Sequence, residues 1–320
     1  MEGRTQESRE RQLVERIKKH DVISVVGLSK NVGKTTVVNF ILRRLEKACV
    51  ITVGMDGENE DKIFKNTKPP IFLPQGNFAV VPSQITPYGV RIIETFETPS
   101  GTLSLVEALV DVEVQTMRMG SYEETSQMIE KIKKYADKVI VDGALARIGA
   151  ISISDATILV TGAQIGKDVN EVVEKTVEYV NRILTPQAPE WMLKVIERNP
   201  TQALIWKKDR ALRIKVNGVA GYEDEIVQAC EDADFVYLPG AVNEEIASHV
   251  KCPIIVPSGD RIFSKVGKFF AVKNVQLIGI AVNHTSVEGN ELDLDELIFE
   301  LKRRLNSGII VFDVLYDHDL

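Results

Sequence analysis

A glycine-lysine-threonine-threonine sequence, Gly33 to Thr36, stands between an apolar β-branched run at 22–27 and an apolar-periodic stretch that begins with Val37. This order of strand, short loop and helix start is typical of a phosphate-binding loop. Backbone N–H groups in such a loop, together with the positive end of the helix dipole, attract a di- or triphosphate. The candidate nucleotide-binding residues are therefore Ser29, Lys30, Asn31, Val32, Gly33, Lys34, Thr35 and Thr36.

Two side chains of this segment suit phosphoryl chemistry. Lys34 is placed to reach the β- and γ-phosphates, so it is a candidate catalytic residue that stabilises developing charge. Thr35 offers a hydroxyl to Mg²⁺. The strict pattern G-x-x-x-x-G-K-[ST] is not met, because position 28 is a leucine and the glycine comes one residue earlier, at Gly27. The competing interpretation is an ordinary strand–turn–helix with a surface lysine.

Two aspartates follow other apolar runs and are candidate metal ligands. Asp142 closes the run KVIVD, and Asp56 follows the run CVITVG. Because the carboxyl ends of strands in a doubly wound sheet meet at one edge, both carboxylates can face the phosphates. Asp142 would hold Mg²⁺, directly or through water, or cap a turn before Gly143. Asp56 would bind Mg²⁺, act as a catalytic residue that orients the nucleophile, or belong to a solvated acidic loop.

The identity of the base is less strongly indicated. Asn283 ends the apolar run LIGIAVN, where it would contact the base or serve as an ordinary turn residue. The chain contains no Asn-Lys-x-Asp sequence of the kind found in many GTPases. The sequence therefore favours ATP over GTP.

The elements that must position these residues alternate along the chain. Apolar runs that predict strands lie at 22–27, 49–54, 138–142 and 156–162. Helical patterns lie between or after them at 34–47, 121–136 and about 166–184. This alternation predicts an α/β fold with a doubly wound, mainly parallel sheet and helices on both faces. A proline-bearing stretch divides a nucleotide-binding domain at 1–185 from a C-terminal α/β region at 190–320, which extends that sheet or forms a second lobe.

Composition excludes several classes of protein. The net charge of −7 argues against a general nucleic-acid-binding protein. No apolar run reaches the ~18 residues of a membrane span. The charged N-terminus predicts a surface helix with Leu13, Val14 and Ile17 on one face and is not a secretory signal. The scattered Cys49, Cys230 and Cys252 predict buried thiols in a reducing compartment, and we expect a cytoplasmic protein.

The shifted glycine and the segments VGMDGENED, VDGALARIGAIS and ATILVTGAQIGKDVNEVV are similar to the dethiobiotin synthetases and cobyrinic-acid amidases, of the SIMIBI class of P-loop NTPases. This resemblance covers about the first 185 residues. It implies binding of ATP and Mg²⁺, contact of Asn283 with adenine, and ATP-dependent ligase or kinase chemistry on a small carboxylate or amine metabolite. The class includes homodimers supported by a signature lysine, and Ser29 occupies that position here, with Lys30 beside it.

Most of the chain resembles a narrower group. The segments GLSKNVGKTT, VDGALARIGA, LVTGA, NHTSVEG and VFDV are similar to the P-loop subunit of lysine 5,6-aminomutase reactivases. This resemblance implies an ATP-driven switch or chaperone that frees an adenosylcobalamin-dependent aminomutase of damaged cofactor, acting with a second ATPase subunit. A nucleotide-binding module without relevant turnover is a third interpretation.

Overall fold

The computed structural model describes residues 2–53, 70–119, 122–144, 150–208, 210–214, 219–305 and 308–313, and the candidate Asp56 lies outside them. The chain forms two compact units, one made of Met1–Val177 with Gln276–Leu320 and the other of Glu178–Val275. This division differs from the two contiguous segments 1–185 and 190–320. The reason is strand β18 (Leu277–Asn283), which returns to the first unit and pairs with β10 (Ala156–Gly162).

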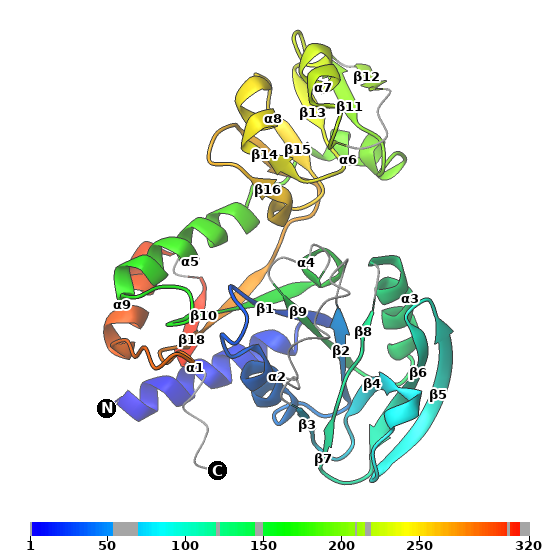
Figure 1. The fold of residues 1–320 in the computed structure, drawn as a ribbon, viewed down its shortest axis with the longest axis vertical. Coiled ribbons are helices and arrows are strands. Elements are labelled where there is room, and N and C mark those ends of the chain that lie inside the picture. The colour runs from blue at the N-terminus through cyan, green and yellow to red at the C-terminus, as the bar shows by residue number, and fades with distance from the viewer. Residues whose placement is uncertain are drawn as a thin grey trace. The chain divides into compact units, whose positions relative to one another are not determined.

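The first unit contains a ten-stranded sheet in the order β19-β18-β10-β1-β9-β2-β4-β6-β5, with β8 also paired to β2 (Figure 1). The bounds of its other strands are β1 Val22–Gly27, β2 Ala48–Val53, β4 Phe78–Pro82, β5 Val90–Thr98, β6 Gly101–Ala108, β8 Arg118–Met119, β9 Lys138–Ala144 and β19 Ile310–Asp313. Neighbouring strands from β19 to β4 are parallel, and β6 is antiparallel to β4 and β5. The predicted α/β class with a mainly parallel sheet is confirmed.

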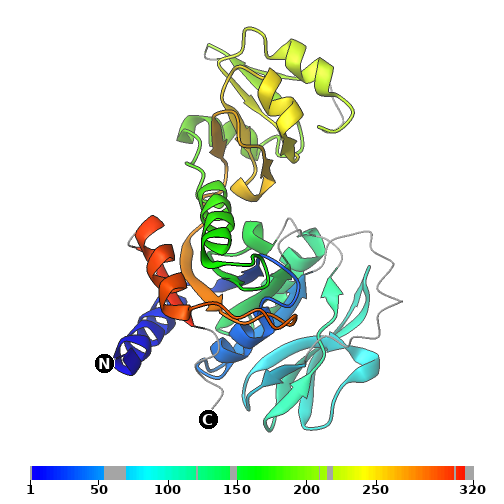
Figure 2. The same ribbon diagram turned by 60° about the vertical axis from the view of Figure 1, so that its left-hand side comes forward.

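The helices of this unit are α1 Glu2–Ile17, α2 Lys34–Leu42, α3 Tyr122–Ile132, α4 Ala150–Ile153, α9 Leu294–Arg304 and the first part of α5 Val169–Ile183. The predicted surface helix at the N-terminus is α1, which buries Leu13 and Ile17 completely. Both α1 and α9 pack against β19, at the end of the sheet opposite β5 (Figure 2).

Helices cover both faces of the sheet. On one face, α1 and α2 share a core cluster with Ile23 and Val25 of β1. Successive side chains of a strand point to opposite faces, so Ser24 belongs to the other face, where its hydroxyl lies 3.0 Å from that of Ser154 just after α4. On this second face Thr161 of β10 hydrogen-bonds Thr176 of α5 at 2.7 Å. The expected arrangement of helices on both faces is confirmed.

Residues 70–119 extend the ten-stranded sheet and add a separate two-stranded sheet. The β5–β6 hairpin belongs to the large sheet, and β7 (Val112–Val114) pairs antiparallel with β3 (Ile71–Leu73) in the small one. The short 3₁₀ helix η1 (Ser83–Ile85) connects β4 to β5. Within the large sheet, β4, β6 and β5 lie beyond β2, on the side away from β10.

The second unit has a five-stranded sheet in the order β12-β11-β13-β15-β17, in which β13, β15 and β17 are parallel. Its elements are α6 Glu190–Glu197, β11 Leu204–Lys207, β12 Arg210–Arg213, α7 Glu223–Ala229, β13 Phe235–Tyr237, β14 Val242–Asn243, α8 Glu244–His249, β15 Ile254–Val256, η2 Gly259–Arg261, β16 Ile262–Phe263 and β17 Phe269–Ala271. Its core includes Trp206 and Tyr237, both nearly inaccessible to solvent. Burial raises the pKa of Tyr237 to about 12, and its hydroxyl donates to the Pro200 carbonyl at 2.7 Å.

Two expectations from composition concern features of the described residues. Cys49, Cys230 and Cys252 are free thiols and all are buried, as expected. Burial raises the pKa of the Cys49 thiol well above its ordinary value, so this thiol stays protonated and packs as a small apolar group. None of the helices in the described ranges has the length and apolar character needed to cross a bilayer.

Candidate functional site

The candidate phosphate loop joins β1 to α2. Asn31 and Gly33 have left-handed backbone conformations, with φ of 59° and 103°. Between them, Val32 is completely buried in the core cluster that α2 shares with the sheet, so only its backbone can face a ligand. At the start of the loop, the Leu28 amide donates to the Val160 carbonyl of β10 at 2.9 Å. The loop is therefore fixed to the sheet at its beginning and near its end.

The position of Gly27 has a steric explanation. A Cβ atom at this residue would lie 2.6 Å from Val32 Cγ1 and 2.7 and 2.9 Å from Cγ and Cδ of Lys34. The stem of Lys34 thus crosses directly over Gly27, and its Nζ donates to the Ser29 carbonyl at 3.0 Å. The glycine that the strict motif requires at position 28 stands at 27 because this is where the lysine side chain meets the backbone.

The N-terminus of α2 differs from the helix starts at which a side chain accepts hydrogen bonds from the first amides. Gly33 is the N-cap of α2, no side chain caps it, and the first turn has no acidic residue. By contrast, Asp168, Asn243 and Asp293 accept hydrogen bonds from backbone amides at the starts of α5, α8 and α9. The first amides of a helix have no partner within the helix, so the positive end of α2 is suited to an external anion.

Asp142 lies on the strand next to β1. The strand β9 continues to Ala144, two residues beyond the end predicted from the sequence, and Asp142 pairs in register with Val25 and Thr52. It therefore shares a face with Val25, the face that α2 covers. Its side chain is 3 % exposed, and Oδ2 accepts from Thr52 Oγ1 at 3.4 Å. The carboxylate is placed on the side of the sheet where the phosphate loop begins its helix.

Thr52 and Thr116 extend this polar group. Their hydroxyl oxygens lie 2.6 Å apart, and Thr116 lies two residues before β8, which pairs with the end of β2. Neither threonine could be singled out from the sequence: Thr52 is one residue of an apolar run, and β8, which follows Thr116, has only two residues and no periodic pattern. No group of three or more histidine, cysteine, aspartate or glutamate side chains able to hold a metal occurs within the described ranges.

The loops after β1 and β10 follow two strands at which the direction of the sheet connections reverses. These two strands are adjacent and parallel, but the chain leaves β1 towards β2 and leaves β10 towards β18. Such a reversal is a topological switch point, and ligands bind there outside the carboxyl ends of the strands. The candidate phosphate loop forms one side of the switch point, and residues 163–168 form the other.

Asn283 is the last residue of β18 and pairs with Gly162, the last residue of β10. Its Oδ1 accepts from both the N–H and the hydroxyl of Thr285, each at 3.1 Å. The backbone N–H can only donate, so the amide oxygen must face Thr285 and Nδ2 faces away. Asn283 is therefore the turn residue that one of the two interpretations expects. Its contact with a base stays a prediction, for which Nδ2 is the donor that no described residue engages.

The sequence analysis did not identify the residues that hold the 163–168 segment. A Cβ atom at Gly162 would lie 1.7 Å from the Asn283 carbonyl oxygen, so glycine is needed where the two strand ends approach. Asn290 donates from Nδ2 to the Gly166 carbonyl at 3.1 Å. The spacing of Asp168 and Glu171 is a helix-start signal that the sequence does contain, whereas nothing in the sequence marks Asn290.

The structure brings the loop 28–36, Asp142 and Asn283 to the carboxyl edge of one sheet, on β1, β9 and β18. Comparisons with protein-family models, with curated proteins and with solved structures found no match to this chain.

Proposed function

We propose that this chain binds Mg-ATP at the loop 28–36 and hydrolyses it slowly as a nucleotide-driven switch. The observation that carries the proposal is the uncapped N-terminus of α2, with Lys34 lying across Gly27 beside it. A buried carboxylate, Asp142, on the neighbouring strand and on the same face supports it. Backbone amides, an ammonium group and a carboxylate are the groups that phosphoryl transfer requires.

The residues divide the chemistry between them. The backbone amides from Gly33 to Thr36 would bind the phosphate oxygens, and Lys34 would stabilise the charge on the transferred phosphoryl group as water attacks it. The Thr35 hydroxyl and the Asp142 carboxylate would hold Mg²⁺, and such hard oxygen donors are those that this ion prefers. When bound, Mg²⁺ neutralises charge on the phosphate oxygens.

The two sides of the loop also give the nucleotide a direction. Asp142 lies on β9, on one side of β1, whereas β10 and β18 lie on the other. Because Asp142 would hold the metal ion that neutralises charge on the terminal phosphates, we expect the γ-phosphate on the side of β9 and the nucleoside on the side of β10 and β18. In this arrangement Asn283 donates from Nδ2 to an acceptor atom of the base. Its oxygen, already accepting two hydrogen bonds, does not accept the 6-amino group of adenine.

The partner in this proposal is a protein that reads the nucleotide state. The resemblance to aminomutase reactivases supplies a candidate, an adenosylcobalamin-dependent aminomutase, on which this chain would act together with a second ATPase subunit. Hydrolysis without the partner would then be slow and would rise when the partner is added.

Isothermal titration calorimetry with Mg-ATP and Mg-GTP tests the nucleotide site. A hydrogen bond to a charged group contributes about 1.5–3 kcal/mol, so Lys34→Ala should weaken Mg-ATP binding by about 10- to 150-fold. Lys19→Ala removes an exposed lysine outside the loop and should leave the affinity unchanged. Flat titrations of the wild-type protein with both nucleotides, or equal affinities of wild type and Lys34→Ala, would refute the proposal.

A further inference from the structure

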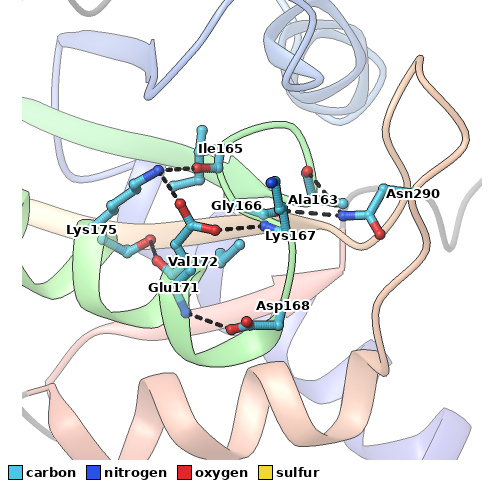
Figure 3. Close-up of polar contacts among 10 residues, drawn as sticks. Ala163, Ile165, Gly166, Lys167, Asp168, Glu171, Val172, Lys175 and Asn290 are labelled. Atoms are coloured by element: carbon cyan, nitrogen blue, oxygen red, sulfur yellow. Dashed lines mark hydrogen bonds and ion pairs between the residues drawn. The ribbon is translucent and has the colours of Figure 1, made fainter.

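The segment 163–168, between β10 and α5, is held in place by hydrogen bonds along most of its length (Figure 3). Within its own helix, Asp168 Oδ1 accepts from the Glu171 amide at 2.9 Å, and Glu171 Oε2 accepts from the Lys167 amide at 2.8 Å. Lys175 Nζ bridges Glu171 Oε1 at 2.7 Å and the Ile165 carbonyl at 2.6 Å. The end of this segment is therefore fixed by the first turns of α5.

The other side of the segment is held from the loop after β18. Asn290 Nδ2 donates to the Gly166 carbonyl at 3.1 Å and, more weakly, to the Ala163 carbonyl at 3.5 Å (Figure 3). The Val287 amide donates to Gln164 Oε1 at 3.2 Å. Asn290 is itself oriented, because its backbone N–H donates to Ser286 Oγ at 2.9 Å. The three bonds from Val287 and Asn290 to the 163–168 segment join residues more than 120 positions apart in the sequence.

The surface that results is uncharged between Ala163 and Gly166. The acidic residues Asp168 and Glu171 cap the start of α5, so its amides are not offered to a phosphate. Ala163, Ile165 and Gly166 are small or apolar and their carbonyls accept hydrogen bonds, and the Gln164 side chain accepts from the Val287 amide. Such a segment suits a flat, weakly polar ligand rather than an anion. This is the opposite of α2, whose first amides have no side-chain cap. The two sides of the switch point thus suit the two halves of a nucleotide.

We propose that Asn290 is a positioning residue for the nucleoside half of the ligand. Its Nδ2 group fixes residues 163–166 as a platform on which the base and ribose rest, and it does not touch the phosphates. The inference rests on the proposed nucleotide site. It adds a residue that no sequence pattern indicates and assigns it to one half of the ligand.

The experiment compares a ligand with and without a nucleoside. Calorimetry with Mg-ATP and with inorganic tripolyphosphate plus Mg²⁺ is carried out on wild type, Asn290→Ala, Asn290→Asp and Glu288→Ala. The aspartate variant keeps the size of the side chain but turns an oxygen towards two carbonyls. Glu288 is exposed in the same loop and is the matched control. Thermal unfolding of each variant shows that it is folded.

We expect Asn290→Ala to weaken Mg-ATP binding by about tenfold and to leave tripolyphosphate binding within twofold of wild type, about the error of such a comparison. Asn290→Asp should weaken Mg-ATP binding at least as much, and Glu288→Ala should change neither affinity. Equal losses of affinity for the two ligands would mean that the substitution disturbs the whole site, and would overturn the inference. Unchanged affinities in both Asn290 variants would also overturn it. A wild-type protein that binds neither ligand would instead refute the proposed nucleotide site.

Discussion

The substitution Gly27→Ala tests how the candidate site is built. Its methyl group would lie 2.6 Å from Val32 Cγ1 and 2.7–2.9 Å from two carbons of Lys34. Carbon atoms that pack without strain are about 3.5–4.0 Å apart, so each contact is too short by roughly 1 Å. Val32 is completely buried in the core, so its contact with the methyl group is relieved only by a small shift of the backbone. The flexible side chain of Lys34 is displaced by its own contacts with the methyl group, and its hydrogen bond to the Ser29 carbonyl breaks.

The size of the effect on binding follows from this displacement. If Lys34 contributes about 1.5–3 kcal/mol to ATP binding, its displacement should weaken binding by about tenfold or more. In the double variant Gly27→Ala/Lys34→Ala, the side chain that the methyl group displaces is already absent. The losses of the two single variants should then fail to add, with a coupling energy of about 1.5–3 kcal/mol.

The assay is calorimetry with Mg-ATP on the wild type, the two single variants and the double variant, each shown by thermal unfolding to be folded. Gly308→Ala serves as a control, because a Cβ atom there has open space around it. A folded Gly27→Ala protein with wild-type affinity would show that the glycine is not needed for the lysine. Losses that add within about 0.5 kcal/mol would show that the two residues act separately.

Two further predictions concern the ends of β10 and β18 and the start of α5. Gly162→Ala should lower the free energy of unfolding by about 3 kcal/mol, because its Cβ atom would overlap the Asn283 carbonyl in a backbone with φ of 147°. Gly289 also has a positive φ, but a Cβ atom there would have open space around it. Urea denaturation of Gly289→Ala should therefore show a loss of unfolding free energy of only about 1–2 kcal/mol. Equal losses in the two variants would contradict the steric explanation. The hydrogen bond from Lys175, followed by that from the Lys167 amide, lowers the pKa of Glu171 below its ordinary value of 4.5. A carboxylate whose pKa is lowered by folding stabilises the folded state at pH values above its ordinary pKa, and this contribution is lost as the pH falls through the folded-state pKa. The melting temperature of Glu171→Gln should therefore fall less steeply than that of wild type below about pH 4.5. Parallel curves of melting temperature against pH would count against the contact.

Some of this organisation could be predicted from the sequence because it is local. Strand β10 was predicted with the bounds that the structure has, and β1 likewise, since both are apolar runs with clear ends. The start of α2 at Lys34 also agrees with the structure, whereas the end predicted at 47 is five residues too late. Helix ends are set by packing as well as by propensity, and the sequence offers no strong stop signal there.

Other features depend on which strands become neighbours. Apolar periodicity indicates that a face is buried but not what covers it. It therefore did not show that β18 and β19 belong to the first sheet, although the second unit lies before them in the sequence. For the same reason Thr52, Thr116 and Asn290 were not identified, because their partners lie far along the chain or on strands too short to have a pattern. Asp56 remains a prediction, because it lies outside the described residues.

The sequence by itself determined the chemistry of the loop 28–36, because a glycine, a lysine and two threonines at a strand-to-helix turn act through contacts only a few residues apart. The tertiary structure decided what surrounds that loop. The order of the parallel strands placed Asp142 on one side of it and Asn283 with the 163–168 segment on the other. Such pairings join residues more than a hundred positions apart, and no local pattern in the chain specifies them.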